Sequence, residues 1–266
     1  MAVFQTNDHV SIHYEIYGTG APLVLLHGWD QSAKAFCENI PVLSQRYQVV
    51  AVDLRGHGES EKPSYGYRIS RLAMDVRQLL EHLDLRDVTL LGWSMGCSVV
   101  WSYWDLFRAD RLRRLILVDE PPLCLINDSN PDGFSNNENL EALKASILSD
   151  TVQATKGFVD MMLCTPEGKA KYAQQTLEES LKFPPKECTR LLLNHVYTDW
   201  RDVIPTIDIP TLVVAAKKSH VLVSNNEWTH AQIPGSRYCL FETAHMMFME
   251  EPEAFNAAVI DFMESC

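Results

Sequence analysis

The chain has 266 residues, of which 46% are hydrophobic, and its formal net charge at neutral pH is -12. That length and apolar content suffice for one sizeable core, so no second domain is needed beyond a small insertion. Acidic residues outnumber basic ones, 35 to 23, and no Lys/Arg-rich block occurs. This argues against a nucleic-acid partner or an anionic membrane surface.

Residues 1–8 contain no basic segment followed by an apolar stretch, and no run of about 18 apolar residues occurs anywhere in the chain. We therefore expect a cytoplasmic protein without a membrane partner. The number of cysteines is 7, an odd number, and none are paired as CxxC, which favours reduced thiols over a disulfide framework. No two histidines have the spacing of metal ligands, so we expect neither a metal nor a cofactor.

The predicted elements begin with an edge hairpin strand at 10–17, where apolar and polar side chains alternate, and a turn at 18–20. Short continuous apolar runs then predict parallel strands that are buried on both faces. These runs lie at 23–26, 49–52, 88–91, 115–118, 211–216 and 237–241. Helical segments such as 69–85 separate the runs, and a closing amphipathic helix is expected at 254–263. The order is typical of the α/β class with a mostly parallel, doubly wound sheet.

One long stretch, 119–210, contains no strand-like run, and its Met, Leu, Phe and Tyr residues recur at helical spacing. A Pro-Pro pair and the turn-forming segment 127–133 mark a departure from the core at its beginning. We predict a helical cap at 121–203, inserted into a core made of 1–120 and 204–266. The alternative is an ordinary layer of helices packed on the sheet.

The most informative motif is Gly-Trp-Ser-Met-Gly at 92–96, which lies between an apolar run and a helix-like segment. A serine on such a strand-turn-helix junction is forced into a strained backbone conformation, and small residues are needed on both sides of it. The turn also aims the amide of Met95 at the space in front of the Ser94 hydroxyl, where an oxyanion would be stabilised. Ser94 is thus a candidate nucleophile, with a glycine-flanked helix start as the alternative.

Reactive groups in an open α/β sheet belong at the carboxyl ends of its strands. After the first parallel run, Gly28 allows close approach of the backbone to a ligand, and the amide of Trp29 can serve as a second oxyanion donor. Later strand ends are followed by a glycine-rich loop at 53–60, by Asp119 and Glu120, and by a loop containing histidine.

Four motifs, in this order, make the chain resemble the α/β-hydrolase fold superfamily, in particular its compact esterase, lactonase and cofactor-free haloperoxidase-like members. They are HGW at 27–29, DLRGHGES at 53–60, GWSMG at 92–96 and AHMMFMEEPEAF at 244–255. The resemblance covers nearly the whole chain. It implies a nucleophile at Ser94, a base at His245 and an oxyanion hole formed by the amides of Trp29 and Met95.

Of the nine histidines, His245 is the one expected to act as the base. It follows the last predicted strand, and only a loop at the strand ends of the same sheet can bring an imidazole within about 2.6 to 3.2 Å of the serine hydroxyl. The resemblance gives His27 and His57 a structural role, in which they brace glycine-rich loops.

The carboxylate partner of the base departs from the usual pattern of the superfamily. Most relatives have an aspartate a few residues after the strand at 211–216, where this chain has Ser219. A charged imidazole needs a carboxylate, so the partner should lie elsewhere. We predict Asp119, because some lactonases, haloalkane dehalogenases and cofactor-free dioxygenases of this superfamily carry the acid at that strand end. Glu120 is the second choice, and Glu227 or no acid at all are the alternatives.

The expected reaction is acyl transfer through an acyl-enzyme, with a small and largely hydrophobic ester or lactone as substrate. Gly28, Trp93 and Met246 are expected to contact the substrate. Together with Trp29 and several apolar cap residues, Trp93 and Met246 suggest an apolar pocket, with packing in the core as the alternative for at least half of these side chains. The cap residues are Phe158, Met161, Met162, Leu163, Tyr172, Leu181, Phe183, Tyr197 and Trp200.

Two other classes of function remain open at this stage. A cofactor-free oxygenase or perhydrolase could use the His-Asp pair, and a ligand receptor on the same fold could turn over slowly. A haloalkane dehalogenase is disfavoured because position 94 is serine rather than a carboxylate. The sequence leaves the oligomeric state open, a homodimer included.

Overall fold

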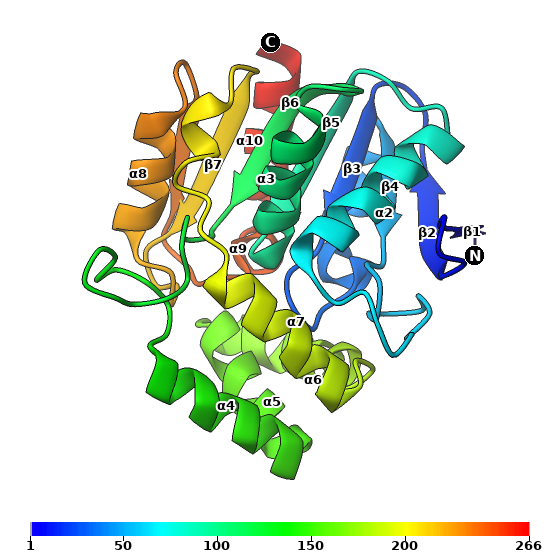
Figure 1. Cartoon of the computed structure of the whole chain (residues 1–266). Coiled ribbons are helices and arrows are strands. Elements are labelled where there is room, and N and C mark those ends of the chain that lie inside the picture. The colour runs from blue at the N-terminus through cyan, green and yellow to red at the C-terminus, as the bar shows by residue number, and fades with distance from the viewer. Residues whose placement is uncertain (1, 266) are drawn as a thin grey trace.

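The computed structural model describes residues 2–265, and an eight-stranded sheet forms its centre (Figure 1). The strands are β1 (Ala2–Gln5), β2 (Ser11–Tyr17), β3 (Pro22–Leu26), β4 (Gln48–Val52), β5 (Val88–Trp93), β6 (Leu112–Val118), β7 (Thr211–Ala216) and β8 (Arg237–Phe241). They pair in the order β1-β2-β4-β3-β5-β6-β7-β8. β1 and β2 run antiparallel to their neighbours, whereas the six strands β3 to β8 are all parallel to one another.

Helices cover both faces of the sheet, as the doubly wound pattern predicts. The helices are α1 (Ile40–Leu43), α2 (Ile69–His82), α3 (Met95–Phe107), α4 (Asn137–Ser149), α5 (Thr151–Met162), α6 (Pro166–Ser180), α7 (Pro185–Tyr197), α8 (Val223–Gln232), α9 (Met247–Glu250) and α10 (Pro252–Ser265). In Figure 1, α2, α3 and α8 lie in front of the sheet, and α10 lies behind it. Two buried apolar clusters fill the spaces between these helices and the two faces of the sheet.

All six predicted parallel strands are present. The apolar runs of β3 to β7 are almost wholly buried, as strands covered on both faces require, whereas β8 lies at the edge of the sheet and is partly exposed. The hairpin prediction was incomplete. β2 pairs with β1, a strand too short to stand out in the sequence, and on its other side with β4. The turn at 18–20 leads to β3, but β3 is not next to β2 in the sheet, because β4 lies between them.

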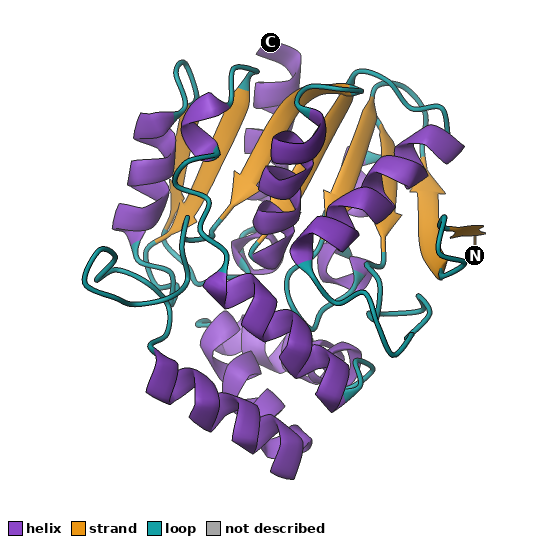
Figure 2. Ribbon diagram, viewed as in Figure 1, coloured by secondary structure: helices purple, strands orange, loops and turns teal. Residues whose placement is uncertain are grey.

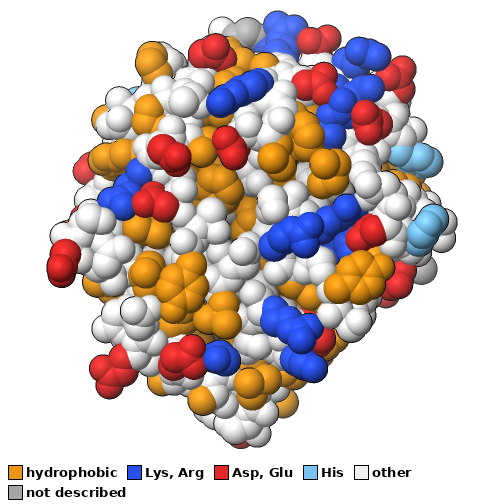
Figure 3. All heavy atoms as spheres, viewed as in Figure 1, with side chains coloured by type: hydrophobic (Ala, Val, Ile, Leu, Met, Phe, Trp, Pro, Cys, Tyr) orange, Lys and Arg blue, Asp and Glu red, His pale blue; other side chains and the backbone are white. Residues whose placement is uncertain are grey.

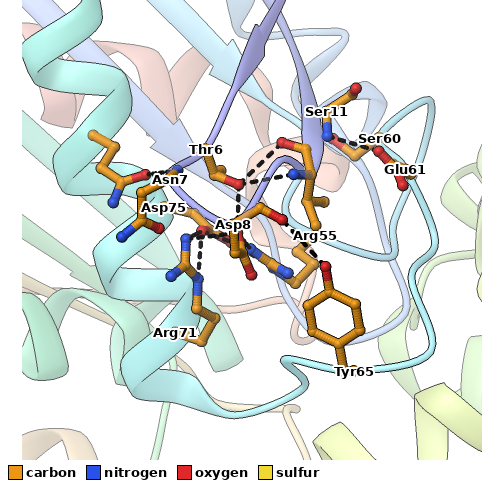
Figure 4. Close-up of polar contacts among 12 residues, drawn as sticks. Thr6, Asn7, Asp8, Ser11, Arg55, Ser60, Glu61, Tyr65, Arg71 and Asp75 are labelled. Atoms are coloured by element: carbon orange, nitrogen blue, oxygen red, sulfur yellow. Dashed lines mark hydrogen bonds and ion pairs between the residues drawn. The ribbon is translucent and has the colours of Figure 1, made fainter.

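A buried arginine fastens the N-terminal hairpin to the core (Figure 4). Arg55 is fully buried, and its Nε and Nη2 donate to the two carboxylate oxygens of Asp75 on α2 at 2.7 and 2.9 Å. Nη2 also donates to Asp8 in the β1–β2 turn at 2.8 Å. Arg71 contacts the same two carboxylates. Burial opposes ionisation of Asp8, but its hydrogen bonds to Arg55 and Thr6 and the charges of Arg55 and Arg71 lower its pKa to about 2, so this carboxylate stays ionised at neutral pH.

The helices α4 to α7 follow β6 and lie beyond the carboxyl ends of the strands rather than against either face of the sheet (Figure 2). Polar contacts connect them to the loop after β3. Gln31 Nε2 donates to Ser180 Oγ at 2.6 Å, and the Lys34 ammonium donates to Glu179 at 2.7 Å. These helices therefore cover the edge where reactive groups are expected. The boundaries 121–203 for a separate cap stay a prediction.

On the face drawn in Figure 3, acidic and basic side chains are scattered among apolar ones. Among residues 2–265, no helix combines the length and the apolar character that crossing a membrane requires.

Candidate active site

Ser94 lies at the sharp junction of β5 and α3, with φ 54° and ψ -129°. A non-glycine residue in this region is strained. The junction leaves no room for side chains two residues away on either side. A Cβ on Gly92 would lie 2.4 Å from the backbone of Gly96, and one on Gly96 would lie 2.4 Å from the carbonyl oxygen of Leu26. Both glycines of the motif are therefore sterically required.

Asp119 occupies the corresponding position at the end of the neighbouring strand. Trp93 and Val118 are paired in the β5–β6 ladder, so Ser94 and Asp119 are the next residue on each strand. The Ser94 amide donates to the Val118 carbonyl at 2.9 Å, and the Asp119 amide donates to the Val214 carbonyl at 2.8 Å. Asp119 also has φ 54°. Two such non-glycine residues cost about 1 to 3 kcal/mol each, and strain of this kind concentrates at functional sites.

His245 and Asp119 are hydrogen-bonded although 126 positions separate them in the sequence. Nδ1 of His245 lies 2.8 Å from Oδ2 of Asp119, and both side chains are almost completely buried. The second carboxylate oxygen, Oδ1, accepts a hydrogen bond of 3.0 Å from the side-chain amide of Asn226 on α8. A carboxylate oxygen that accepts from Nδ1 fixes the tautomer with its proton on Nδ1, and the lone pair of Nε2 is then free to act as a base.

Neighbouring elements hold the His245 loop in place. The indole Nε1 of Trp93 donates to the His245 carbonyl at 3.0 Å, and the Met246 amide donates to the Met162 carbonyl at 3.1 Å. Trp93 also packs against the imidazole, with ring centroids 5.2 Å apart. Because Trp93 immediately precedes Ser94 in the chain, the same residue connects the serine turn to the histidine loop.

The other candidate acids lie elsewhere. Glu120 is buried but contacts Cys124 and His195 instead of His245. Glu227 is exposed on α8. Ser219, at the position where the acid was expected by resemblance, has its hydroxyl 3.3 Å from Nδ1 of His245. Among the four side chains, only Asp119 offers His245 a carboxylate at hydrogen-bond distance within the described residues.

The loop after β3 brings the predicted oxyanion residues beside the serine. A Cβ on Gly28 would lie 3.0 Å from the Cβ of Ser94, so this loop and the serine turn are in close contact. The Leu54 amide donates to Nε2 of His27 at 3.0 Å, which leaves Nδ1 to donate to the Gly28 carbonyl at 2.8 Å. Burial lowers the pKa of His27, so it braces the loop as a neutral ring.

His57 has a similar environment, and two further contacts complete the surroundings of the oxyanion loop. Nδ1 of His57 donates to the Arg55 carbonyl at 2.9 Å, and burial lowers the pKa of His57 well below its ordinary value. The indole Nε1 of Trp29 donates to the Cys188 carbonyl of α7 at 3.2 Å. On the other side, α3 begins at Met95, and the first amides of a helix have no partners within it. These amides and the positive end of the helix dipole lie next to Ser94.

A cavity opens at Ser94 between the strand ends and the covering helices. Its volume is about 420 Å³, part of which is open to solvent. Its apolar wall includes Trp29, Phe134 and Phe158. Its polar residues are Ser94, Glu120, Cys124, His195 and His220.

The lining agrees in part with the residues expected from the sequence, since Trp29 lines the cavity. Trp93 and Met246 are fully buried outside the cavity wall, because they fasten the His245 loop. Gly28 contacts Ser94 but does not line the cavity. Of the cap residues proposed, Phe158 lines the cavity. The others do not line the cavity and are either buried elsewhere or exposed. They are Met161, Met162, Leu163, Tyr172, Leu181, Phe183, Tyr197 and Trp200.

Sequence reasoning missed four polar cavity residues, or missed what they do. The ring of His220 lies against that of His245, with centroids 4.3 Å apart, and burial together with that neighbour lowers the pKa of His220 well below its usual value. Glu120, Cys124 and His195 form a second buried cluster. Burial and the Glu120 carboxylate raise the pKa of the Cys124 thiol well above its usual value. No sequence pattern predicts that these residues lie together, because His195 is on α7 and contacts Glu120 only in the folded chain.

Comparisons with known proteins agree with this architecture. The family model for the alpha/beta hydrolase fold matches residues 21–252. A non-heme chloroperoxidase of Kitasatospora aureofaciens is 31% identical, with 99% of both chains covered. Two solved structures cover 99% of this chain and of their own: a bromoperoxidase from Bacillus anthracis, with 27% identity and a TM-score of 0.94, and an esterase from Exiguobacterium antarcticum, with 29% identity and a TM-score of 0.93. The chain therefore belongs to the alpha/beta hydrolase fold family.

Proposed function

We propose that the protein is a serine hydrolase that cleaves small, largely hydrophobic carboxylic esters or lactones. The observation that supports this most strongly is the hydrogen bond between His245 and Asp119 at the strand ends that also present the strained Ser94. Similarity to an esterase of the same fold adds to it. In this proposal Ser94 is the nucleophile, His245 the base and Asp119 the acid.

The reaction begins when Ser94 Oγ attacks the substrate carbonyl and its proton passes to Nε2 of His245. Asp119 stabilises the resulting imidazolium and keeps the proton of Nδ1 in place. The amides of Met95 and Trp29 stabilise the oxyanion, a contribution worth about 3 to 4 kcal/mol per donor in comparable enzymes. His245 returns its proton to the leaving alcohol. Water, with His245 again as base, then releases the acid and regenerates Ser94.

The substrate class follows from the cavity. Its apolar aromatic wall favours a hydrophobic acyl group, and its limited volume favours a short one. We therefore expect aryl acetates and propionates to be cleaved faster than aryl octanoates.

The test combines covalent labelling with ester hydrolysis. A fluorophosphonate should label the wild-type protein once, and Ser94→Ala should abolish the label and lower p-nitrophenyl acetate hydrolysis by about a thousandfold or more. Ser102→Ala, which removes a buried serine from the same helix outside the cavity, is the matched control and should retain both properties. Ser94→Ala with nearly full turnover would refute the nucleophile assignment.

Perhydrolysis is the second candidate, because a chloroperoxidase and a bromoperoxidase are among the proteins similar to this one. Hydrogen peroxide would replace water in the second step and attack the acyl-enzyme carbonyl. The bond to Ser94 Oγ would break, and a peracid would leave. Peracid formed from an ester and peroxide by the wild type, but not by Ser94→Ala, would support this activity.

A further inference from the structure

Three potential metal ligands share the cavity with Ser94. Glu120 and Cys124 follow β6, whereas His195 belongs to the last turn of α7. Each residue is more than nine-tenths buried, and all three line the cavity. Their side chains were brought together by the fold from two separate segments, and the proposed hydrolytic steps use none of them.

The three donor atoms form a compact triangle. Nε2 of His195 lies 3.1 Å from Oε1 of Glu120, Sγ of Cys124 lies 3.2 Å from the same oxygen, and Sγ lies 3.5 Å from Nε2. In a tetrahedral zinc site, S, N and O ligands are about 3.3 to 3.6 Å apart. The centre of the observed triangle is about 1.9 Å from each corner, so an ion about 1 Å out of its plane would be about 2.1 Å from all three, close to zinc bond lengths.

The chemistry of the donors also selects a cation. A thiolate and an imidazole favour Zn²⁺ over Mg²⁺ or Ca²⁺, which prefer oxygen ligands. One thiolate and one carboxylate would neutralise a divalent ion inside this buried site. Within residues 2–265, His195 is the one basic side chain that forms an ion pair with Glu120.

We propose that Glu120, Cys124 and His195 form a three-ligand site for Zn²⁺ whose fourth coordination position faces the cavity at Ser94. Binding releases the thiol proton of Cys124, and coordination through Nε2 leaves the proton of His195 on Nδ1. Nδ1 has no hydrogen-bond partner within the described residues, so no contact at that atom holds the ring in the opposite tautomer. A bound ion occupies space that an acyl group would need, and Zn²⁺ therefore inhibits the protein.

The binding test does not depend on hydrolysis, because it uses the full chain carrying Ser94→Ala. Co²⁺ should produce a near-ultraviolet thiolate-to-cobalt band and visible bands of tetrahedral type, and Zn²⁺ should displace it. Cys124→Ser should abolish the thiolate band. His195→Gln should weaken Zn²⁺ binding in calorimetry by more than about tenfold, because mutating even a residue that only hydrogen-bonds to a metal ligand typically lowers metal affinity by about tenfold or more.

Two further variants keep the test decisive. Cys164→Ser is the matched control, since Cys164 contacts the carboxylate of Glu250 without lining the cavity, and it should leave the cobalt spectrum unchanged. Glu120→Gln preserves side-chain volume and serves if Cys124→Ser proves unstable, and it should also weaken binding. No thiolate band in the parent chain, or a band that survives Cys124→Ser, would overturn the site.

In the protein with Ser94 intact, Zn²⁺ should inhibit ester hydrolysis and a chelator should restore it. Zn²⁺ binding without inhibition would refute the orientation toward Ser94.

Discussion

The hydroxyl of Ser219 lies 3.3 Å from Nδ1 of His245, the nitrogen that the Asp119 carboxylate contacts at 2.8 Å. One imidazole nitrogen is thus within reach of two strand ends, that of β6 and that of β7. Asp119 supplies a carboxylate from β6, while the position after β7 supplies a neutral hydroxyl. This arrangement makes the location of the acid testable, because a carboxylate could be moved from one strand end to the other.

Replacing Asp119 with Asn should lower kcat/KM for an aryl ester by about a thousandfold to ten-thousandfold, because the imidazole loses the acceptor that fixes its tautomer. Adding Ser219→Asp to that variant should recover at least about tenfold, since the new carboxylate lies near the same nitrogen. Steady-state kinetics of the single and double variants measure both effects.

Glu227→Gln is the control for this pair, because Glu227 is exposed on α8 and should have no effect on kcat/KM. Equal activity of Asp119→Asn and the wild type would contradict the assignment of the acid. If adding Ser219→Asp to Asp119→Asn recovers no activity, only the proposed interchange of the two strand ends is contradicted.

Trp29→Phe should lower kcat/KM by about fivefold to tenfold, because it removes the hydrogen bond from the indole to the Cys188 carbonyl on α7. Phe retains an aromatic ring near Phe158, which Trp29 contacts edge-on at 5.3 Å between centroids. Kinetics and thermal melting measured together would separate a loosened oxyanion loop from lost stability. A large fall in melting temperature with unchanged kcat/KM would contradict this role.

Arg55→Met should lower the free energy of unfolding by about 3 to 5 kcal/mol, because it leaves the carboxylates of Asp75 and Asp8 near a buried site without their main partner. Urea denaturation followed by fluorescence provides the measurement. Arg86→Met removes an exposed arginine paired with Asp84 and should change stability little. Similar stabilities of the two variants would refute the importance of the buried cluster.

Asp30→Asn should change how stability depends on pH. Burial raises the pKa of Asp30 from 3.8 to about 7 in the folded protein, with Gln31 and Ser180 opposing that shift. Between these values the folded chain holds a proton that the unfolded chain has released, so the contribution of Asp30 to stability is full below pH 3.8 and falls as pH rises to about 7.

The measurement for Asp30 is the difference in free energy of unfolding between wild type and Asp30→Asn, from urea titrations at several pH values. That difference should decline from pH 4 to pH 7 and then level off. Comparing the two proteins cancels the opposite slope of groups that both share, such as Asp53, whose pKa is lowered to about 2. A difference that rises with pH would show that Asp30 is ionised in the folded chain.

The sequence predicts the central sheet well because buried parallel strands require continuous apolar runs, and such runs are conspicuous at Leu23–Leu26 and Thr211–Ala216. It also predicts the strained turn at Ser94, since the two glycines are imposed by local sterics. β1 was missed because four residues carry too little periodicity.

The cavity was harder to anticipate. Whether Trp93 faces a ligand or fastens the His245 loop depends on contacts between segments far apart in the chain. The same is true of His195, which reaches Glu120 only through the packing of α7. Local sequence patterns contain no information about such distant contacts, so residue type alone predicted only part of the cavity wall, namely Trp29 and Phe158.

The pairing of Trp93 with Val118 sets the spacing between Ser94 and Asp119 by the register of two central strands. The covering helices can consequently be reshaped, or exchanged with those of a homologue, without shifting these two side chains relative to each other. Substrate preference in this scaffold is in that sense modular, and libraries aimed at new substrates should vary α4 to α7 while keeping the central strands intact.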